Sequence, residues 1–378
     1  MDLSTCHPNH SSVARPLLRL LIALSFVAST LQPAEAGDRV RTGYWKAGRA
    51  PDGWVLYETE HYQVQCAAGE TLAMAVGAHA EAMLSVYRDM LPSRKKMPSF
   101  VIKVFADREG FLAYRPEASD FVAWYDKDEK ELLAYDTGVM LGDRYGPGHI
   151  RLVNDYPREL SAWETERLDE LFAEINDRYI EDLAGLVAHE AWHQYFHYYT
   201  VSWVAMPAWL DEGLGDYFLT ARSDGAGGVD VGAVFPDGAR ISRQIIEDGI
   251  ALPLGELFDL DQAGYYAEGW ARYAQGWSVV HFLMHHDEAP MAELIPAYLK
   301  DFKKSKNFRK TNKSIFAGID LEALDEQWRR WALSLPQDDP MGRLAERFAE
   351  MIGPGDLEAP QPWRDVYAWY RERALSER

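Results

Sequence analysis

The segment His189-Glu190-Ala191-Trp192-His193 is the feature that most constrains how this chain folds. Two histidines four residues apart lie on one face of a helix, one turn apart, so both imidazoles can reach one metal ion. Glu212 follows in Trp209-Leu210-Asp211-Glu212-Gly213, where a second helix can supply a carboxylate. Three protein ligands leave a fourth position for water, which is the layout of a catalytic zinc site. The fold must therefore bring two helices together here, with Glu190 placed to take a proton from that water.

The residues around this motif favour a metal site over a chance match. The bare pattern arises by accident in roughly a few per cent of chains of this kind, so it is only moderately specific alone. The apolar segment Leu183 to Ala188 predicts a buried helix, and Pro207 suits the first turn of the helix that carries Glu212. The alternative is a pair of hydrogen-bonded core histidines.

His197 continues the histidine face of the first helix, four residues after His193. Three ligands along one straight helix do not converge well on one ion. The extended metzincin motif has a glycine and a last histidine after H-E-x-x-H. Phe196 and Tyr199 stand at those positions here. We therefore predict packing, or support of a ligand, for His197.

Asp216 lies one helical turn after Glu212 and is the candidate partner of a metal-bound histidine. Such a histidine usually donates its second N–H to a carboxylate or a carbonyl. The alternative is a solvated helix carboxylate. Gly213 and Gly215 cost helix stability. Their expected use is to let two helices approach closely, without a chemical role.

The chain predicts an α+β fold with two lobes and the active-site helix between them. Its 378 residues, 47% apolar, are enough to bury a sizeable core. Strand patterns dominate a mixed α/β lobe over 37–160, and helical patterns dominate a catalytic lobe over 161–335. A helical tail occupies 336–378. No linker-like composition separates the lobes.

Local patterns predict the elements of each lobe. The expected strands are Trp54–Cys66, Phe100–Phe105, His149–Val153 and a hairpin of Phe121–Tyr125 with Glu131–Tyr135. The expected helices are Ala67–Met90, one that starts at the capping box Ser161–Glu164, Arg178–Thr200, Trp270–His285 and Leu321–Leu335.

The first 36 residues have the pattern of a secretory signal peptide. Arg15 and Arg19 precede the short apolar run Leu20–Ala28, and Ala34-Glu35-Ala36 is an A-x-A cleavage signal. We expect a cut after Ala36 and a periplasmic or secreted protein. The alternative is a single membrane anchor. No later stretch is long and apolar enough to span a bilayer, so we expect no integral membrane segment in the mature chain.

Cysteine and charge limit the possible sites and partners. Cys6 lies in the expected signal, which leaves Cys66 alone in an apolar strand, where burial is the better prediction than reactivity. The net charge of −20 argues against nucleic acid, and against binding to anionic membranes through bulk charge. The stretch Lys300 to Lys313 is instead positively charged, with seven basic residues and one acidic residue, Asp301. A solvated face is the expected reading, and a contact for an anionic envelope component is the alternative.

The pattern H-E-x-x-H, eighteen residues, then Glu resembles the gluzincin metallopeptidases, with the spacing of their aminopeptidase branch. The segments Pro207–Phe218, Tyr273–Leu283 and Glu58–Val64 resemble the bacterial "peptidase MA-like" or DUF1570 group. This likeness covers most of residues 54–335. It implies a zincin-like fold, zinc held by His189, His193 and Glu212, and Glu190 as the general base.

A tetrahedral oxyanion needs a hydrogen-bond donor in addition to the metal. The resemblance implies that a tyrosine downstream of the glutamate ligand is this donor. Tyr273 follows Glu212 at a similar distance along the sequence. Tyr265 and Tyr266 compete for that role. A tyrosine packed in the core is the alternative for each.

The expected function is zinc-dependent hydrolysis of an amide bond in a peptide, a protein or an envelope component. The aminopeptidase motif Gly-x-Met-Glu-Asn is absent, so the sequence predicts no site that would bind the free N-terminus of a peptide substrate. One alternative is a non-catalytic, zinc-containing envelope binding protein, which the presence of Glu190 argues against. Another is a zinc hydrolase of a non-peptide amide or ester.

Overall fold

A computed structural model describes the protein over seven stretches of chain. These are residues 50–119, 121–140, 143–144, 182–200, 204–223, 228–285 and 293–336. The predicted signal peptide, the strand at 149–153, the helix start at 161–164 and the tail beyond 336 lie outside the described residues.

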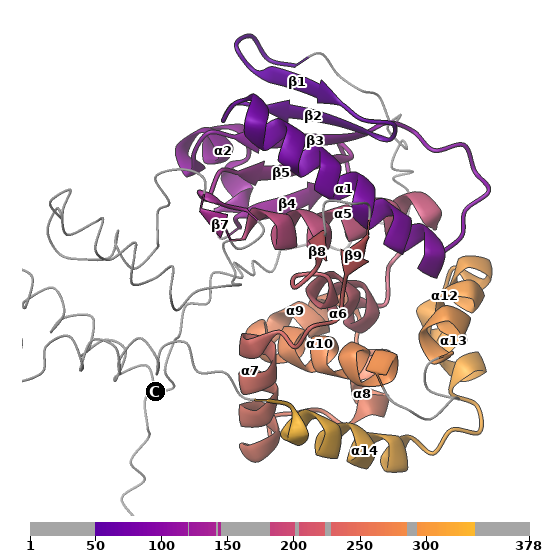
Figure 1. Ribbon diagram of the computed structural model, residues 1–378. Coiled ribbons are helices and arrows are strands. Elements are labelled where there is room, and N and C mark those ends of the chain that lie inside the picture. Colours follow the sequence, from indigo (N-terminus) through magenta and orange to yellow (C-terminus); the bar gives the residue numbers. More distant parts are fainter. Residues whose placement is uncertain are drawn as a thin grey trace, which may run out of the picture. The chain divides into compact units, whose positions relative to one another are not determined.

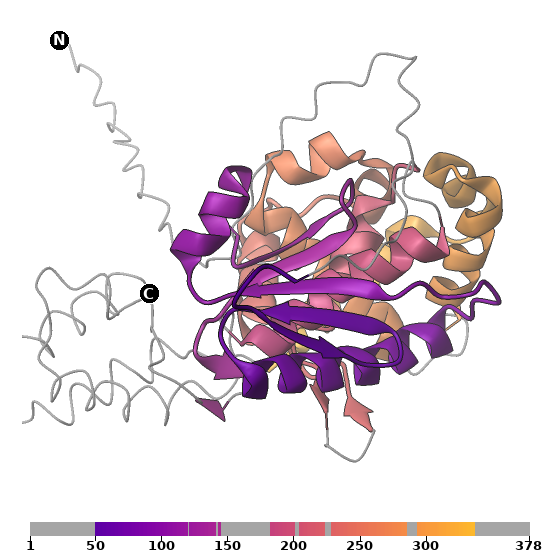
Figure 2. The same ribbon diagram turned by 90° about the horizontal axis from the view of Figure 1, so that it is seen from above.

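A five-stranded mixed sheet forms the first half of the described chain (Figure 2). In the order β1-β2-β3-β5-β4, the central pairs β2–β3 and β3–β5 are parallel and the two outer pairs are antiparallel. Within the described residues, β4 is therefore an edge strand. The strands are β1 (Val55–Glu58), β2 (Tyr62–Cys66), β3 (Phe100–Phe105), β4 (Ala123–Asp126) and β5 (Glu131–Tyr135).

The prediction of one strand over Trp54–Cys66 was wrong, because β1 and β2 form an antiparallel hairpin. Glu81 holds the turn between them: its Oε1 accepts from Thr59 Oγ1 at 2.6 Å and from the His61 backbone N–H at 2.5 Å. Polar groups that a continuous strand would leave unpaired are satisfied by this distant carboxylate. The hairpin predicted further along is confirmed as β4 and β5.

Helices cover both faces of the sheet (Figure 1). α1 (Glu70–Met90) and α5 (Leu183–Tyr199) pack on one face, and the short α2 (Arg108–Tyr114) packs on the other. Strand alternation in β3 follows this division. Ile102 belongs to the core beneath α1 and α5, whereas Phe105 belongs to the small cluster beneath α2. Cys66 is buried in β2, as predicted.

The second half of the described chain is mainly helical, so the α+β prediction is confirmed. α10 (Trp270–His285) is its centre and packs against α6 (Ala208–Tyr217), α7 (Pro236–Glu247) and α14 (Leu321–Ser334). α6 also packs against α5, which therefore lies between the sheet and the helical half (Figure 1). The remaining elements are α8 (Leu254–Asp259), α9 (Gln262–Ala267), α12 (Leu294–Ser305), α13 (Phe308–Ile315), the 3₁₀ turn Pro116–Ala118, and the two-residue strands β6 (Val139–Met140), β7 (Asp143–Arg144), β8 (Arg222–Ser223) and β9 (Val229–Asp230).

Among the described helices, none has both the length and the apolar character needed to cross a bilayer.

Candidate metal centre

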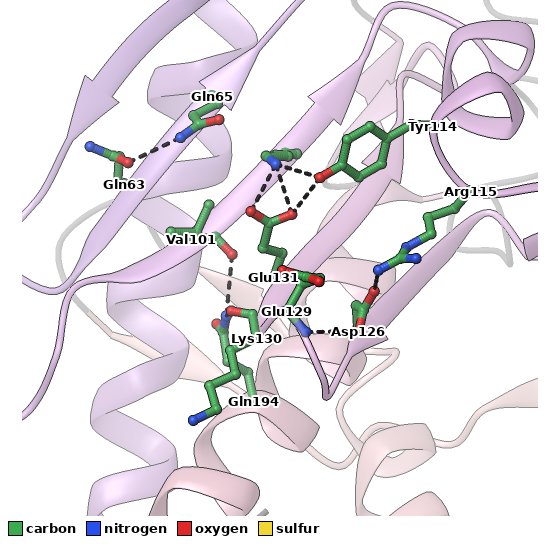
Figure 3. A network of polar contacts seen from close by, with 11 residues as sticks. Gln63, Gln65, Val101, Tyr114, Arg115, Asp126, Glu129, Lys130, Glu131 and Gln194 are labelled. Atoms are coloured by element: carbon green, nitrogen blue, oxygen red, sulfur yellow. Dashed lines mark hydrogen bonds and ion pairs between the residues drawn. The ribbon is translucent and has the colours of Figure 1, made fainter. Parts of the chain in front are cut away.

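α5 is anchored at its start and along its length, which fixes the histidines that it carries. Asp182 caps the helix, since its Oδ1 accepts from the Ala184 backbone N–H at 2.9 Å, and its Oδ2 pairs with Arg222 at 2.8 Å. The fully buried Gln194 donates through Nε2 to the carbonyl oxygens of Val101 at 3.2 Å and Lys130 at 3.3 Å. The neighbour of His193 is thereby tied to the sheet (Figure 3).

The turn that receives Gln194 is itself held by polar contacts. Asp126 Oδ1 accepts from the backbone N–H groups of Asp128 and Glu129, and Asp126 Oδ2 pairs with Arg115. Figure 3 also shows Glu131 at the start of β5 within this network. Its carboxylate oxygens each lie 2.7 Å from Lys103 Nζ. The β4–β5 turn is therefore a fixed support for α5.

α6 approaches α5 and α10 closely because it contains two glycines. A Cβ on Gly213 would lie 2.7 Å from the carbonyl oxygen of Gly276 in α10, and a Cβ on Gly215 would lie 2.8 Å from the ring of His189. The predicted close approach of two helices therefore applies to Gly213. Gly215 has a different use, because it makes room for a candidate ligand. Trp192 Nε1 joins the helices by donating to the Asp211 carbonyl oxygen at 3.0 Å.

The two helices bring together the three predicted ligands. His189, His193 and Glu212 could hold a metal ion, since one ligand atom from each lies within 4.8 Å of the other two. The two Nε2 atoms are 3.0 Å apart, and Glu212 Oε2 lies 3.5 Å from each of them. Donors that surround a tetrahedral zinc at ~2.0–2.1 Å are about 3.3 Å from one another. The donor spacing and the nitrogen and oxygen chemistry therefore both fit zinc.

Carboxylates face the second nitrogen of each histidine. Asp216 Oδ1 lies 3.1 Å from His189 Nδ1, on the helix turn where the sequence predicted this partner. Asp211 Oδ1 lies 2.9 Å from His193 Nδ1, a role that sequence reasoning missed. Both contacts leave the Nε2 atoms directed at the shared point, which is how outer carboxylates orient metal-binding imidazoles.

The electrostatics of the centre favour positive charge at the imidazoles. Burial alone would lower the pKa of His189, but Asp216 and Glu212 outweigh it and raise the pKa to about 9. Burial also opposes charge on His193, yet Asp211 and Glu212 raise its pKa well above the ordinary value. Burial acts to raise the pKa of Glu212, and the two histidines overcome it and hold that pKa below its usual range. A metal cation bound between His189, His193 and Glu212 would likewise place positive charge there.

Glu190 lies between the two histidines in sequence, and its carboxylate is directed at the sheet. Its Oε2 accepts from the backbone N–H of Tyr125 in β4 at 2.7 Å. Burial raises the pKa of this carboxyl, and the neighbouring His189 and His193 oppose that rise. A carboxyl whose pKa is raised toward neutrality is suited to accept and return a proton.

Tyr266 contacts the centre directly, through a hydroxyl that donates to Glu212 Oε1 at 2.7 Å. The sequence had placed Tyr273 first and Tyr266 among its competitors. The Tyr273 ring is buried and stacks on that of Tyr266, with 6.0 Å between centroids, and Tyr265 packs edge-on against both. Tyr266 therefore orients a candidate ligand, and Tyr273 adjoins it in the same aromatic group.

His197 packs against the sheet. Its ring lies edge-on to Tyr125, with 5.3 Å between ring centroids, and burial lowers its pKa to about 4. Among the described residues it does not belong to the group that could hold a metal. This agrees with the predicted packing role.

Residues 183–304 match the family model described as "Protein of unknown function (DUF1570)". The match begins at the first residue of α5 and ends within α12. No curated protein and no solved structure matches the chain. The DUF1570 match contains all three candidate ligands, both of their carboxylate partners and the three tyrosines. Tyr125, whose amide meets Glu190, lies outside it.

Proposed function

We propose that the protein is an exported zinc metallopeptidase of the gluzincin type, which hydrolyses an amide bond. The observation that carries this proposal is the convergence of His189 Nε2, His193 Nε2 and Glu212 Oε2 with donor spacings of 3.0 and 3.5 Å. When bound by these residues, zinc lowers the pKa of its water and polarises a carbonyl.

The chain's own residues supply the orientation and the proton transfers. Asp216 and Asp211 hold the two imidazoles with Nε2 inward. Glu190 accepts a proton from the attacking water and returns it to the leaving amine, a task for which its raised pKa is suited. A protein that only bound a ligand would need no such base beside the metal, so Glu190 favours catalysis over the binding-protein alternative.

The position of β4 favours a peptide as the substrate. β4 is one of the two edge strands of the sheet that the described residues form, and α5 packs against it. An edge strand offers backbone groups to an extended peptide, which can add to the sheet through main-chain hydrogen bonds. A peptide bound in this way would pass beside Glu190, since Tyr125 belongs to β4 and its amide bonds to that carboxylate.

Metal analysis and hydrolysis of a broad peptide library, run in parallel on matched variants, test the proposal. The wild-type chain is expected to carry about one zinc and to cleave a subset of peptides. Glu190→Gln is expected to keep the zinc and lose cleavage. Glu129→Gln, at an exposed glutamate on the β4–β5 turn, is the control and is expected to keep both.

Two results would overturn the proposal in different ways. A wild-type chain that binds no zinc at micromolar free metal would exclude a zinc site of useful affinity. A chain that binds zinc but cleaves no peptide would exclude the peptidase. Hydrolysis confined to non-peptide amides or esters in that second case would identify the other hydrolase class.

A further inference from the structure

Lysines from two distant parts of the sequence meet at the C-terminal end of α5. Lys95, which follows α1, donates through Nζ to the carbonyl oxygens of Tyr198 and Tyr199, at 3.2 Å each. Lys306, which ends α12, donates to the carbonyl oxygen of Thr200 at 3.2 Å. Lys303 Nζ lies 3.6 Å from the centre of the Tyr199 ring. The last carbonyls of a helix carry partial negative charge, so they attract these ammonium groups.

Exposed basic residues extend this group into a patch, which we call the basic patch. Lys300 and Lys304 lie three residues before and one residue after Lys303, so all three share one face of α12. Figures 1 and 2 both show α12 beside the segment that follows α1. The basic patch is defined as Lys95, Lys303 and Lys306, the exposed Lys300 and Lys304 of the same α12 face, and the exposed Arg94 and Lys96 that flank Lys95 in sequence.

The acidic residue within this stretch of α12 is already engaged. Asp301 accepts from Thr311 Oγ1 at 2.9 Å, which ties it to α13. That hydrogen bond leaves the charge of Asp301 in place, and the lysines still repel one another: burial, and then Lys95, lower the pKa values of both Lys303 and Lys306. This concentration of positive charge occurs on a chain with a net charge of −20. A partner of opposite charge would relieve the repulsion.

The composition of the basic patch indicates what kind of partner fits. Six of its seven residues are lysines, compact hydrated charges on flexible stems, whereas bidentate recognition of a single phosphate or carboxylate favours arginine. The large apolar side chains that the described residues expose are Leu56, Met74, Tyr114 and Trp270, and none lies in the segments 94–96 and 300–306 that form the basic patch. The attraction is therefore electrostatic and spread over a surface, without an inserted apolar anchor.

We propose that the basic patch docks the protein reversibly on an anionic lipid bilayer, through the phosphates of the lipid headgroups. Each lysine near such a surface strengthens binding about five-fold, which corresponds to about 1 kcal/mol. The acidic remainder of the molecule does not prevent docking, because charges more than ~8–10 Å from the surface are screened at physiological ionic strength. This inference needs neither zinc nor catalysis, so it stands or fails apart from the proposed function.

Docking would also orient the candidate metal centre. His193 and Thr200 are seven residues apart on α5 and its cap, which corresponds to ~10 Å along the helix. The metal centre would then lie close to the bilayer, within reach of peptide segments that emerge from it or lie along it.

Sedimentation with vesicles tests the docking. The chain is expected to bind vesicles of phosphatidylglycerol and phosphatidylcholine, to bind pure phosphatidylcholine vesicles far less, and to lose the difference as salt rises from about 0.05 to about 0.5 M. Lys300→Glu combined with Lys304→Glu is expected to weaken the phosphatidylglycerol-dependent partitioning by at least about thirty-fold, which is the loss that follows from removing the two positive charges alone. Both lysines are exposed on α12, and circular dichroism checks that the variant folds.

A control variant carries the same change of charge elsewhere. Arg108→Glu with Arg330→Glu alters two exposed residues outside the basic patch and is expected to change partitioning by less than about two-fold. Equal losses in both variants would overturn the proposal, because net charge would then be the cause. Salt-insensitive binding, or equal binding to both vesicle types, would also overturn it. Patch-dependent retention on soluble polyphosphate without binding to vesicles would assign the surface to a polymer instead.

Discussion

Replacing Gly215 by alanine tests whether the space beside His189 is what makes the centre. The new Cβ would lie 2.8 Å from the His189 ring, whereas ordinary contact begins at 3.4 Å, so the ring must retreat by about 0.6 Å. Coordination distances tolerate only about 0.2 Å. We therefore expect Gly215→Ala to weaken zinc binding by about 10- to 100-fold, the range found when imidazole orientation is disturbed. Overpacking costs about 1–3 kcal/mol and the helix propensity of alanine returns about 1 kcal/mol, so the free energy of unfolding falls by only about 0–2 kcal/mol.

Two further glycine variants separate zinc affinity from stability. Gly213→Ala meets a backbone oxygen of α10 and not a ligand, so it is expected to lower the free energy of unfolding more than Gly215→Ala does. Gly255→Ala meets only Leu321 Cδ1 at 3.6 Å and is expected to change neither quantity substantially. Competition with a zinc chelator gives the affinity, and urea unfolding of the metal-free chains gives the stability.

A Gly215→Ala chain that binds zinc within two-fold of the wild type would contradict the expected displacement of His189. A zinc affinity that falls only in proportion to the free energy of unfolding across the three variants would contradict it equally. Either result would mean that the His189 ring can move without disturbing the ligand set.

Three other changes act on the same centre or on the helix beside it. Asp211→Asn removes the charge that faces His193, and chelator competition should give a zinc affinity about 10- to 100-fold lower with little change in secondary structure. Tyr266→Phe removes a hydrogen bond to a charged ligand, worth about 1.5–3 kcal/mol, and should weaken zinc binding while the acid limb of any activity profile moves. Burial lowers the pKa of His79 to about 4, so as the pH falls from about 6.5 to about 4 the unfolded state takes up the proton first and stability declines by about 3 kcal/mol. His79→Gln should flatten that decline in urea unfolding measured across the same range, and an unchanged slope would contradict the assignment.

The candidate ligand triad was predictable because its geometry is local. Two histidines one turn apart are fixed by helix periodicity, and the spacing to Glu212 places a carboxylate on the next helix. Asp216 followed from the same periodicity. α10 coincides with its predicted range because an apolar-rich helical pattern runs from Trp270 to His285.

The misses depend on contacts between distant segments. Asp211 precedes a ligand in sequence, and only the angle at which α6 meets α5 turns it toward His193. Glu81 splits an expected strand into a hairpin from twenty residues away in α1. Tyr266 reaches Glu212 across 54 positions, and spacing along the chain had ranked Tyr273 ahead of it. Periodicity places a residue on a face of its own helix, and it carries no information on what that face will meet.

The Tyr125 amide donates its hydrogen bond to Glu190 at the edge of the sheet. A peptide strand that adds to this edge would therefore compete with the candidate base for the same N–H donor. A single N–H serves one good acceptor at a time, so any chain that adds to β4 and accepts from Tyr125 must displace the carboxylate. The Tyr125 N–H keeps an acceptor in this exchange, whereas Glu190 loses a donor and becomes available to another one, such as a water molecule. Arrival of an extended chain would then be the event that frees Glu190, and a ligand that leaves this amide untouched would find the carboxylate still tethered to the strand.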